Sequence, residues 1–415
     1  MIKKHTNTTT MKKTFAFLFS LMLFAAVPAT AQEFIELAAD EEFSADMLAS
    51  DDFESEDIFA TDELVDEEPA EAEESFNPGS TIIGHVTDAH SWHMFDYFDK
   101  SGKEHAVAIP LPVILINNGH LDVFMSSKFH HGHADYKGYR LVGGGIEKEE
   151  IICVDEAGQP LLDEAGKVVK PLDFSITKVP AAIMIIVVLL IVIVMIAKNG
   201  YKKRENQAPK GLQSLVEMLV VFVRDSIVRP MIGEKHYEKY LPYMLTLFFF
   251  IFFTNCMGLI PFFPAGANVT GNLAVTATLA VITFLITNLS GNKHYWVDIF
   301  NTPGVPAWLK IFPLMPVVEL VGVFTKPIVL MIRLFANMTA GHIVILGFVV
   351  IIFIISNTIS MGVGAGVSVI SVVFSVFISV LECLVAYIQA FVFTLLSAIY
   401  IGMACGHEES TELVK

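Results

Sequence analysis

The sequence predicts an all-α polytopic membrane protein with a small N-terminal extracytoplasmic extension of α+β or β-rich fold. Of its 415 residues, 53% are hydrophobic and only 17% are charged, whereas a soluble protein carries about 25% charged residues. The mean hydropathy is +0.58, and several uncharged runs are long enough to cross a bilayer. The membrane part is predicted to hold several transmembrane helices, one interfacial amphipathic helix and a hairpin of two long tilted helices.

Residues 1–31 have the layout of a signal peptide. Lys12 and Lys13 precede the apolar run TFAFLFSLMLFAAV, which ends at an A-x-A cleavage site at residues 29–31. The alternative is an uncleaved first membrane helix, although the run is short for a hydrocarbon core of about 30 Å. Met11 is an alternative start to Met1.

Residues 32–75 form an acidic segment that we expect to be disordered, because like charges repel and few large side chains are available to bury. Nineteen of the 44 Asp and Glu residues fall within residues 33–74, which contain no Lys or Arg, so the other 25 nearly balance the 27 Lys and Arg. The formal net charge of −17 therefore belongs to this segment and says nothing about the membrane part.

Residues 76–178 are predicted to form a small domain outside the cytoplasm. Apolar stretches such as HAVAIPLPVILI are separated by turn signals at residues 117–119 (NNG) and 143–145 (GGG), which indicates short strands and hairpins. Eight of the thirteen histidines lie here. Their spacing could supply zinc or copper ligands, but no fixed motif matches, and no metal site is predicted.

The membrane part is predicted at residues 179–405, followed by a cytoplasmic tail at residues 406–415. Its first apolar run begins near Pro180, and five Lys and Arg residues follow between positions 198 and 210. Because short cytoplasmic loops are rich in these residues, this loop is placed in the cytoplasm.

The next segments continue this topology. Residues 211–230 carry apolar side chains at helical spacing, as in an amphipathic helix at the cytoplasmic interface. Two further spans are predicted at roughly residues 241–263 and 272–290. The connector at residues 291–313 returns to the cytoplasmic side and carries aromatic residues of the kind found at interfaces.

Two apolar segments, residues 314–356 and 363–403, are too long for upright spans. As helices of about 40 residues they would be about 60 Å long, twice the hydrocarbon core. Neither has a polar turn near its middle, whereas Gly362, Gly364 and Gly366 lie at the junction between them. Two long tilted helices joined as a hairpin are therefore predicted, and not four upright ones.

The first long segment carries ionisable side chains, which cost about 2.5–3.5 kcal/mol each in lipid. Glu319, Lys326 and Arg333 are spaced by seven residues and share one helical face, which Asn337 extends. His342 lies nine residues beyond Arg333 and therefore on the opposite face. Lys326 could merely pair with Glu319 or reach an interface. Arg333 cannot lose its charge, which makes it the strongest functional candidate.

The second long segment has a polar seam of its own. Serines at helical spacing lead to Glu382 and Gln389, which share a face. Such groups can hold membrane helices together or line a path for ions. The spacing alone leaves both interpretations open.

The stretches TKPIVLMIRLFANMTAGH and ECLVAYIQAFVFTLLSAIY resemble the signature of subunit a of F-type ATP synthases, the membrane stator that faces the rotating c-ring. The resemblance covers roughly residues 180–405 and extends to Thr254 and Asn255. It implies a bacterial ion-translocating subunit with two steeply tilted helices and no catalysis by the chain alone.

The resemblance also implies roles for single residues. Arg333 matches the family's indispensable arginine, with Asn337 and Gln389 as the residues that accompany it. Some bacterial members have Glu where this chain has His342 and His where it has Glu382, so the pair is expected to share one proton path. The remaining candidates for ion translocation are Asn255, Glu319 and Lys326. Family members often carry an acidic residue near position 258, which here is Gly258.

The mechanism implied by the resemblance has two aqueous half-channels that reach the c-ring, with Arg333 between them to deprotonate the rotor carboxylates. Proton flow would thereby drive rotation and ATP synthesis. The expected partners are the c-ring, the b-subunit stator stalk, the F1 head and membrane lipid. The expected location is the bacterial inner membrane, with the N-terminal domain outside and the C-terminus in the cytoplasm. The sequence leaves open whether protons or sodium ions are coupled, and how large the ring is.

Other classes of protein fit the sequence less well. A secondary transporter is expected to show an internal repeat, and none is visible. The sequence has no G-x-S-x-G, H-E-x-x-H or Walker motif, so neither an intramembrane enzyme nor a nucleotide site is predicted. No cofactor and no nucleic-acid partner are expected.

Overall fold

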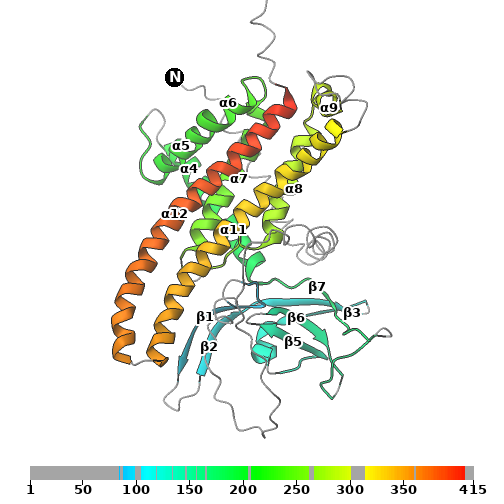
Figure 1. Cartoon of the computed structure of the whole chain (residues 1–415), viewed down its shortest axis with the longest axis vertical. Coiled ribbons are helices and arrows are strands. Elements are labelled where there is room, and N and C mark those ends of the chain that lie inside the picture. The colour runs from blue at the N-terminus through cyan, green and yellow to red at the C-terminus, as the bar shows by residue number, and fades with distance from the viewer. Residues whose placement is uncertain are drawn as a thin grey trace, which may run out of the picture.

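The computed structural model describes residue 84 and residues 87–406, apart from residues 99–103, 118, 133, 145–146, 156, 164–165, 204–206, 261–265, 301–313 and 359–360. Strands occupy the first part of the described chain and helices the rest (Figure 1). The predicted signal peptide, the acidic segment and the C-terminal tail after residue 406 lie outside the described residues. The predicted fold class, a polytopic helical membrane protein with a β-rich N-terminal part, is confirmed.

The strands of the described residues form three small sheets, all antiparallel. β1 (Ser91–Phe98) pairs with β2 (Glu104–Pro110), β3 (Pro112–Asn117) lies between β4 (His120–Met125) and β7 (Leu172–Asp173), and β5 (Tyr139–Gly144) pairs with β6 (Glu147–Cys153). A 3-10 helix at Ser126–Gly132 follows β4. In the β3–β4 hairpin Asn117 lies opposite His120, and Gly119 has a φ of +81°, which glycine adopts without strain. The hairpin predicted at this position is therefore present.

Residues 87–177, called the strand domain below, have a small apolar core of their own. Val113, Leu115 and Phe129 are fully buried and pack with Tyr139 and Cys153. Val113 and Leu115 are alternate residues of β3, so they point to the same face of the sheet.

The helices follow in one continuous series. They are α4 (Lys178–Lys203), α5 (Leu212–Phe222), the π-helix η2 (Val223–Val228), α6 (Arg229–Ile232), α7 (Tyr237–Gly258), α8 (Leu273–Leu289), α9 (Lys293–Phe300), α11 (Leu314–Thr358) and α12 (Met361–Cys405). Among the described helices, α4, α7, α11 and α12 are long and apolar enough to cross a membrane, and α8 is apolar but shorter.

Two details differ from the predicted elements. α7 ends at Gly258 and not at residue 263, because Pro261 disfavours a helical conformation in the residue before it. The predicted amphipathic helix is divided by the π-helix η2. Its first apolar side chains, such as Leu215 (49% exposed), are not covered by the rest of the described chain, whereas Ile227 is fully buried.

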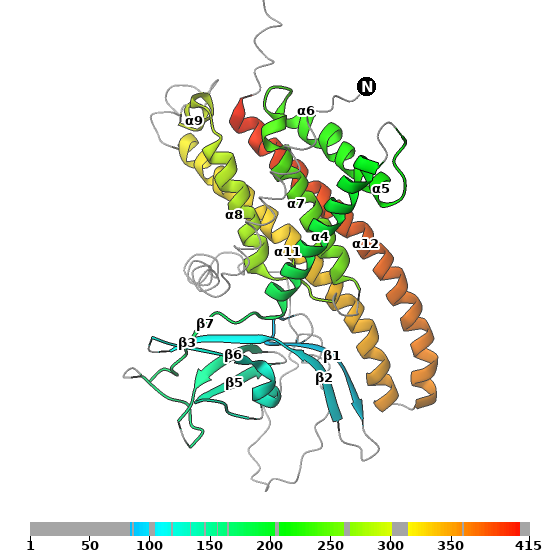
Figure 2. The ribbon, with the colours of Figure 1, turned by 180° about the vertical axis from the view of Figure 1, so that it is seen from behind.

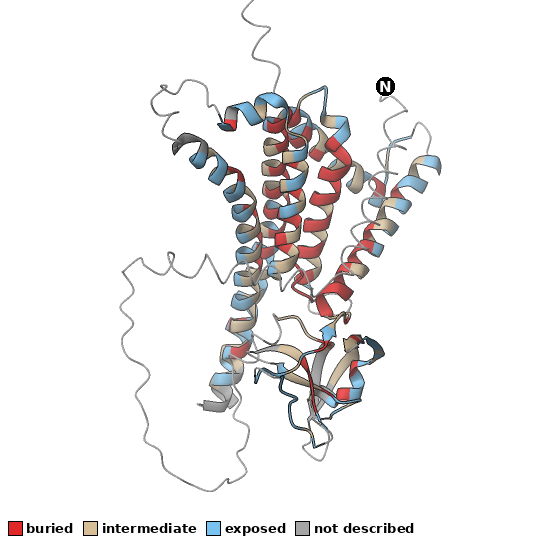
Figure 3. Ribbon diagram, turned by 90° about the vertical axis from the view of Figure 1, so that its right-hand side faces the viewer, coloured by how far each residue is buried: buried red, intermediate tan, exposed pale blue. Residues whose placement is uncertain are grey.

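The hairpin of α11 and α12 is the largest feature of the fold. Each helix has 45 residues and is therefore about 68 Å long. Only 11% and 17% of their most apolar windows are buried, compared with 72% for α7. The hairpin thus presents a long exposed apolar face beside a well-packed bundle (Figure 3). The predicted pair of long helices is confirmed.

The strand domain is attached to the N-terminal end of α4 (Figure 2). Trp92 belongs to the same apolar core as Val179 of α4. Asp88 accepts hydrogen bonds from the backbone N–H of Val179 (2.9 Å) and from the hydroxyl of Thr177 (2.6 Å). A carboxylate at this end satisfies free helical N–H groups and complements the helix dipole. Asp88 therefore caps a helix that begins 90 residues later.

A buried histidine connects three segments of the strand domain. Nε2 of His90 lies 2.9 Å from Oδ2 of Asp173, and Nδ1 lies 3.3 Å from Oε2 of Glu149. Burial disfavours the imidazolium, but the hydrogen bonds and charges of the two carboxylates outweigh burial and raise the pKa of His90 to about 9. Burial likewise opposes ionisation of Glu149 and Asp173, yet His90 holds the pKa of both below its usual value.

We expect the strand domain to lose stability as the pH rises from about 6.5 to 9. A group whose pKa is higher in the folded state than in the unfolded state stabilises the fold. Its full contribution is present when the pH is below the unfolded pKa, which is about 6.5 for histidine. This contribution is lost as the pH rises through the folded value of about 9. The thiol of Cys153, which is 1% exposed, reports opening of the domain. Its maleimide labelling, normalised to a free thiol at each pH, should accelerate over this range.

The matched variants are His90→Gln and His120→Gln, since His120 is an exposed residue of β4. We expect Cys153 to be labelled quickly in His90→Gln already at pH 6, and at the wild-type rate in His120→Gln. A Cys153 that stays protected in His90→Gln would show that the two ion pairs do not stabilise the domain.

Candidate functional site

Arg333 lies in the middle of α11, on a helix that is mostly exposed. Its side chain is half-buried, and Ile332 and Asn337 beside it are exposed. Within the described part of the chain, no carboxylate forms an ion pair with Arg333, and no hydrogen bond reaches its guanidinium. Because a guanidinium stays charged at any physiological pH, α11 carries a fixed positive charge without a counter-charge from the described residues.

His342 lies nine residues further along α11, about 13 Å along the helix axis. It is packed against the end of α7. A Cβ added to Gly258 would be 3.2 Å from Nε2 of His342 and 3.5 Å from the carbonyl oxygen of Ala267. Nε2 is buried and has no hydrogen-bond partner among the described residues. Gly258 is therefore in contact with His342.

Glu382 reaches α11 from α12 and lies beside the residue that precedes His342. A Cβ added to Gly341 would overlap Oε1 of Glu382, so the carboxyl group can hold this position only beside a glycine. Glu382 is 6% exposed, and neither of its carboxyl oxygens has a hydrogen-bond partner in the described chain. The structure thus places Glu382 against the residue next to His342, and no hydrogen bond joins the two side chains.

Further polar groups surround this place at the junction of α7 and α8. Asn255 is one helical turn before Gly258, and its Oδ1 accepts a hydrogen bond of 2.6 Å from the hydroxyl of Thr270. The amide nitrogens of Asn255 and Asn268 are buried without a partner in the described residues. Sequence reasoning identified Asn255 but missed Asn268 and Thr270. The signal for both was the polar loop AGANVTGN, which interrupts two apolar runs.

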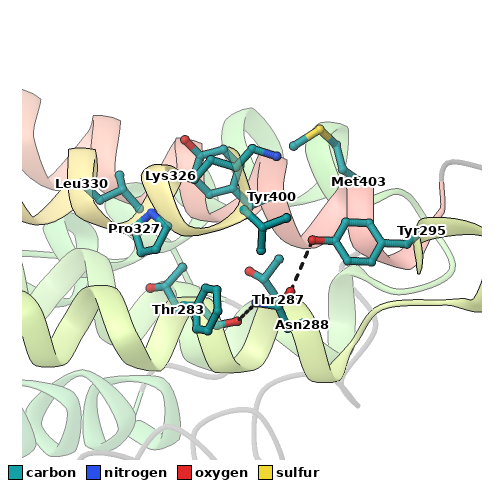
Figure 4. Close-up of a pocket in the computed structure, with 11 residues that line it drawn as sticks. Thr283, Thr287, Asn288, Tyr295, Lys326, Pro327, Leu330, Tyr400 and Met403 are labelled. Carbon is teal, nitrogen blue, oxygen red and sulfur yellow. Dashed lines mark hydrogen bonds between the residues drawn. The ribbon is translucent and has the colours of Figure 1, made fainter. Parts of the chain in front are cut away.

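A second polar region lies at the opposite end of the helices, where α8, α9, α11 and α12 meet (Figure 4). Nζ of Lys326 lies 5.5 Å from the centre of the Tyr400 ring. The hydroxyl of Tyr295 donates a hydrogen bond of 3.4 Å to Asn288, and the hydroxyl of Thr287 is buried without a partner in the described part. The pocket encloses about 20 Å³, enough for one water molecule.

Glu319 does not neutralise Lys326. Glu319 is half-buried near the start of α11, and no ion pair joins it to Lys326 in the described chain. Of the two structural roles that the sequence allowed for Lys326, pairing with Glu319 is therefore not observed.

Gln389 lies at about the level of Arg333. Phe348 stacks on Phe374, Gly341 contacts Glu382, and Lys326 lies over Tyr400. In an antiparallel pair, these three contacts fix the register and place Arg333 opposite roughly residues 389–393 of α12. Gln389 is 5% exposed, so it faces the interior at this level, whereas Asn337 faces outward.

No metal site is found among the described residues, since no three His, Cys, Asp or Glu side chains are grouped as a metal would require. His90, one of the eight histidines considered as ligands, is instead bonded to two carboxylates.

Two family models match the chain. The model described as ATP synthase A chain matches residues 181–402, and one described as a domain of unknown function (DUF8433) matches residues 81–174. ATP synthase subunit a of Pelodictyon phaeoclathratiforme is 38% identical over 288 residues, which cover 68% of this chain and 80% of that protein. ATP synthase subunit a 2 of Prosthecochloris aestuarii is 42% identical over 315 residues, which cover 72% and 93%. ATP synthase subunit a of Myxococcus xanthus is 41% identical over 242 residues, which cover 57% and 75%.

Proposed function

This chain belongs to the ATP synthase A chain family, and from that premise we propose that it is the stator subunit against which a ring of rotor carboxylates turns. As a family member it is a multi-pass membrane protein of a bacterial ATP synthase that translocates protons. The proposal adds that Arg333 discharges the rotor carboxylates and keeps two proton paths apart.

The observation that carries the proposal is the missing counter-charge of Arg333. A charged side chain at the centre of a bilayer costs about 2.5–3.5 kcal/mol or more, and the described residues offer it no carboxylate. Its partner is therefore a carboxylate of a neighbouring subunit, and the exposed face of α11 and α12 leaves room for such a subunit. An opposite charge within about 4–6 Å favours the ionised form of a carboxyl group, so each rotor carboxyl gives up its proton as it passes.

The positions of the polar groups along α11 support two paths. His342 and Glu382 lie about 13 Å from Arg333 toward the strand domain, and Lys326 lies about 10 Å from it toward the other end. Protons from outside would pass through water from His342 and Glu382 to the ring, and leave on the side of Lys326 and Glu319. The fixed charge of Arg333 repels a proton that would cross directly from one path to the other.

The separation of the two proton paths couples the energy of proton crossing to rotation of the ring. Each proton that crosses a potential of 100 mV releases about 2.3 kcal/mol. Because the two paths do not connect, a proton completes the crossing only when the ring turns. We infer that the ring passes this energy to an F1 head, while a b-subunit stalk holds the chain still. The strand domain lies outside the cytoplasm, and the basic loop between α4 and α5 lies within it.

Arg333→Ala tests the assignment of the cation. Without the guanidinium, a rotor carboxyl group loses the charge that lowers its pKa by about 1–3 units. We therefore expect ATP synthesis in energised membrane vesicles to fall by about tenfold or more, while the detached head still hydrolyses ATP. Arg140→Ala is the matched control, because Arg140 pairs with Asp135 on the surface of the strand domain. Normal synthesis in Arg333→Ala would remove Arg333 from the mechanism.

Gly341→Ala tests whether the position of Glu382 matters. The new Cβ would overlap Oε1 of Glu382 and displace it by more than about 1 Å, and a misplacement of about 1 Å can already cost up to about 10² in rate. We expect ATP-driven proton pumping to fall by roughly ten- to a hundredfold. Gly347→Ala on the same helix is the matched control, since its Cβ would meet no atom within 4 Å.

Glu382→Gln tests separately whether the carboxyl group of Glu382 carries protons. The amide keeps the shape of the carboxyl group but cannot carry a proton, so pumping should be lost although packing is retained. Full pumping in Glu382→Gln, with or without an effect of Gly341→Ala, would exclude Glu382 from the proton path.

A further inference from the structure

The three-stranded sheet of β4, β3 and β7 has apolar side chains on both of its sides. Alternate residues of a strand point to opposite sides of a sheet, and directly paired residues point to the same side. Val113 and Leu115 of β3 point into the core of the strand domain. The opposite side, called the outer face below, is made by apolar residues: Pro112, Ile114 and Ile116 of β3, Leu121, Val123 and Met125 of β4, and Leu172 of β7.

The outer face is open in the structure. Leu121, Val123 and Leu172 are 63%, 57% and 54% exposed, and Met125 is 42% exposed. An antiparallel sheet that packs one side on a core usually turns polar side chains to water on the other side. On β4 this pattern is reversed, because Asp122 is partly buried on the core side. A contiguous exposed apolar patch of this kind marks a surface that contacts a membrane or another protein.

The outer face lies on the side of the strand domain that is nearer to the membrane helices. The core that covers the opposite side of the sheet includes Tyr139 of β5 and Ile151 of β6. In two views, β5 and β6 lie farther from the helices than β3 and β7 do (Figures 1 and 2). The outer face is therefore turned toward the end of the helices from which the strand domain projects.

The chain continues from this face directly into the first described membrane helix. Backbone pairing with β3 extends beyond β7, because the N–H of Phe174 donates to the carbonyl oxygen of Ile114 (2.9 Å) and that of Ile176 to Pro112 (3.0 Å). By alternation, the side chains of Phe174 and Ile176 extend the outer face. Ile176 packs against the apolar core that contains Val179 of α4, so the outer face is continuous with the core of the membrane helices.

We propose that the outer face lies against the bilayer, on the leaflet from which the strand domain projects, and that its apolar side chains contact lipid. Leu172 lies six residues before Lys178, where α4 begins, which keeps it within about 20 Å of the start of a helix that can span the membrane. Surfaces of this kind bury their apolar side about 5–10 Å deep in the boundary between headgroups and acyl chains. The inference requires membrane insertion of the chain and is independent of the role of Arg333.

The competing occupant of the outer face is protein. In the described sheet β4 is an edge strand, paired with β3 alone, and such an edge can pair with a strand of another chain. The orientation of the face favours lipid, because a protein that covered it would have to fill the space between the strand domain and the bilayer. The face also carries no charged side chain, so its contact with lipid does not require anionic headgroups.

The test measures what surrounds a nitroxide label on the outer face. Val123→Cys and Leu172→Cys are labelled in the intact ATP synthase, which is reconstituted in vesicles of phosphatidylcholine, a lipid without net charge. Glu150→Cys is the matched control, because Glu150 is an exposed residue of β6 whose neighbour Ile151 points into the core, so it faces away from the bilayer. Wild-type enzyme treated in the same way gives the background of the four native cysteines.

Two relaxing agents then distinguish the surroundings of the label. Oxygen is concentrated in lipid, whereas a nickel chelate stays in water. We expect oxygen to relax the labels at Val123→Cys and Leu172→Cys more strongly than the chelate does, and the order to be reversed at Glu150→Cys. Both labels on the outer face must show this order for the proposal to stand, so a local distortion at one position does not decide the result.

Two results would overturn the proposal. Relaxation by the nickel chelate as strong as at Glu150→Cys would place the outer face in water. Shielding from both agents would show that protein covers the face, either a second copy paired along β4, another subunit or a different segment of this chain. Neither result changes the expectation for Arg333→Ala, which depends on α11 alone.

Discussion

The proposed function depends on a positive charge that the described chain itself does not neutralise. Arg333 lies in the middle of a 45-residue helix whose apolar face is left open by the rest of the described protein. An ammonium at this position could shed its proton, whereas a guanidinium cannot. The charge is therefore permanent, and under the proposed function a neighbouring subunit supplies its counter-charge. The length, the exposure and the hairpin form of α11 and α12 all allow a neighbour to supply it.

One continuous helix sets the distances in the site. Lys326, Arg333 and His342 belong to α11, so their separations are fixed by its rise of 1.5 Å per residue and not by flexible loops. Two glycines then admit other elements to its surface, since Gly341 makes room for Glu382 and Gly258 lets the end of α7 approach His342. Small residues at helix contacts in membranes commonly serve this purpose. Here they place polar groups next to one another.

Sequence reasoning could predict what depends on composition and helical spacing. The length of the two apolar runs predicted the hairpin of α11 and α12. The spacing of seven residues predicted that Lys326 and Arg333 lie on the same face of α11. It could not predict that Glu382 lies against Gly341, because that contact depends on the register between α11 and α12. Nor could it pair Asp88 with Val179, since such a long-range contact is fixed by tertiary packing. α7 ends at Gly258, five residues before the predicted end, because Pro261 disfavours a helical conformation in the residue before it.

The most direct measurement is a density map of the intact membrane complex that resolves side chains around α11. The guanidinium of Arg333 should lie within about 4–6 Å of a carboxylate from a ring of subunits beside the hairpin, the range over which one charge controls the ionisation of another. A map in which Arg333 pairs with a carboxylate of its own chain, or points to bulk water with no ring beside it, would contradict the role given to this residue.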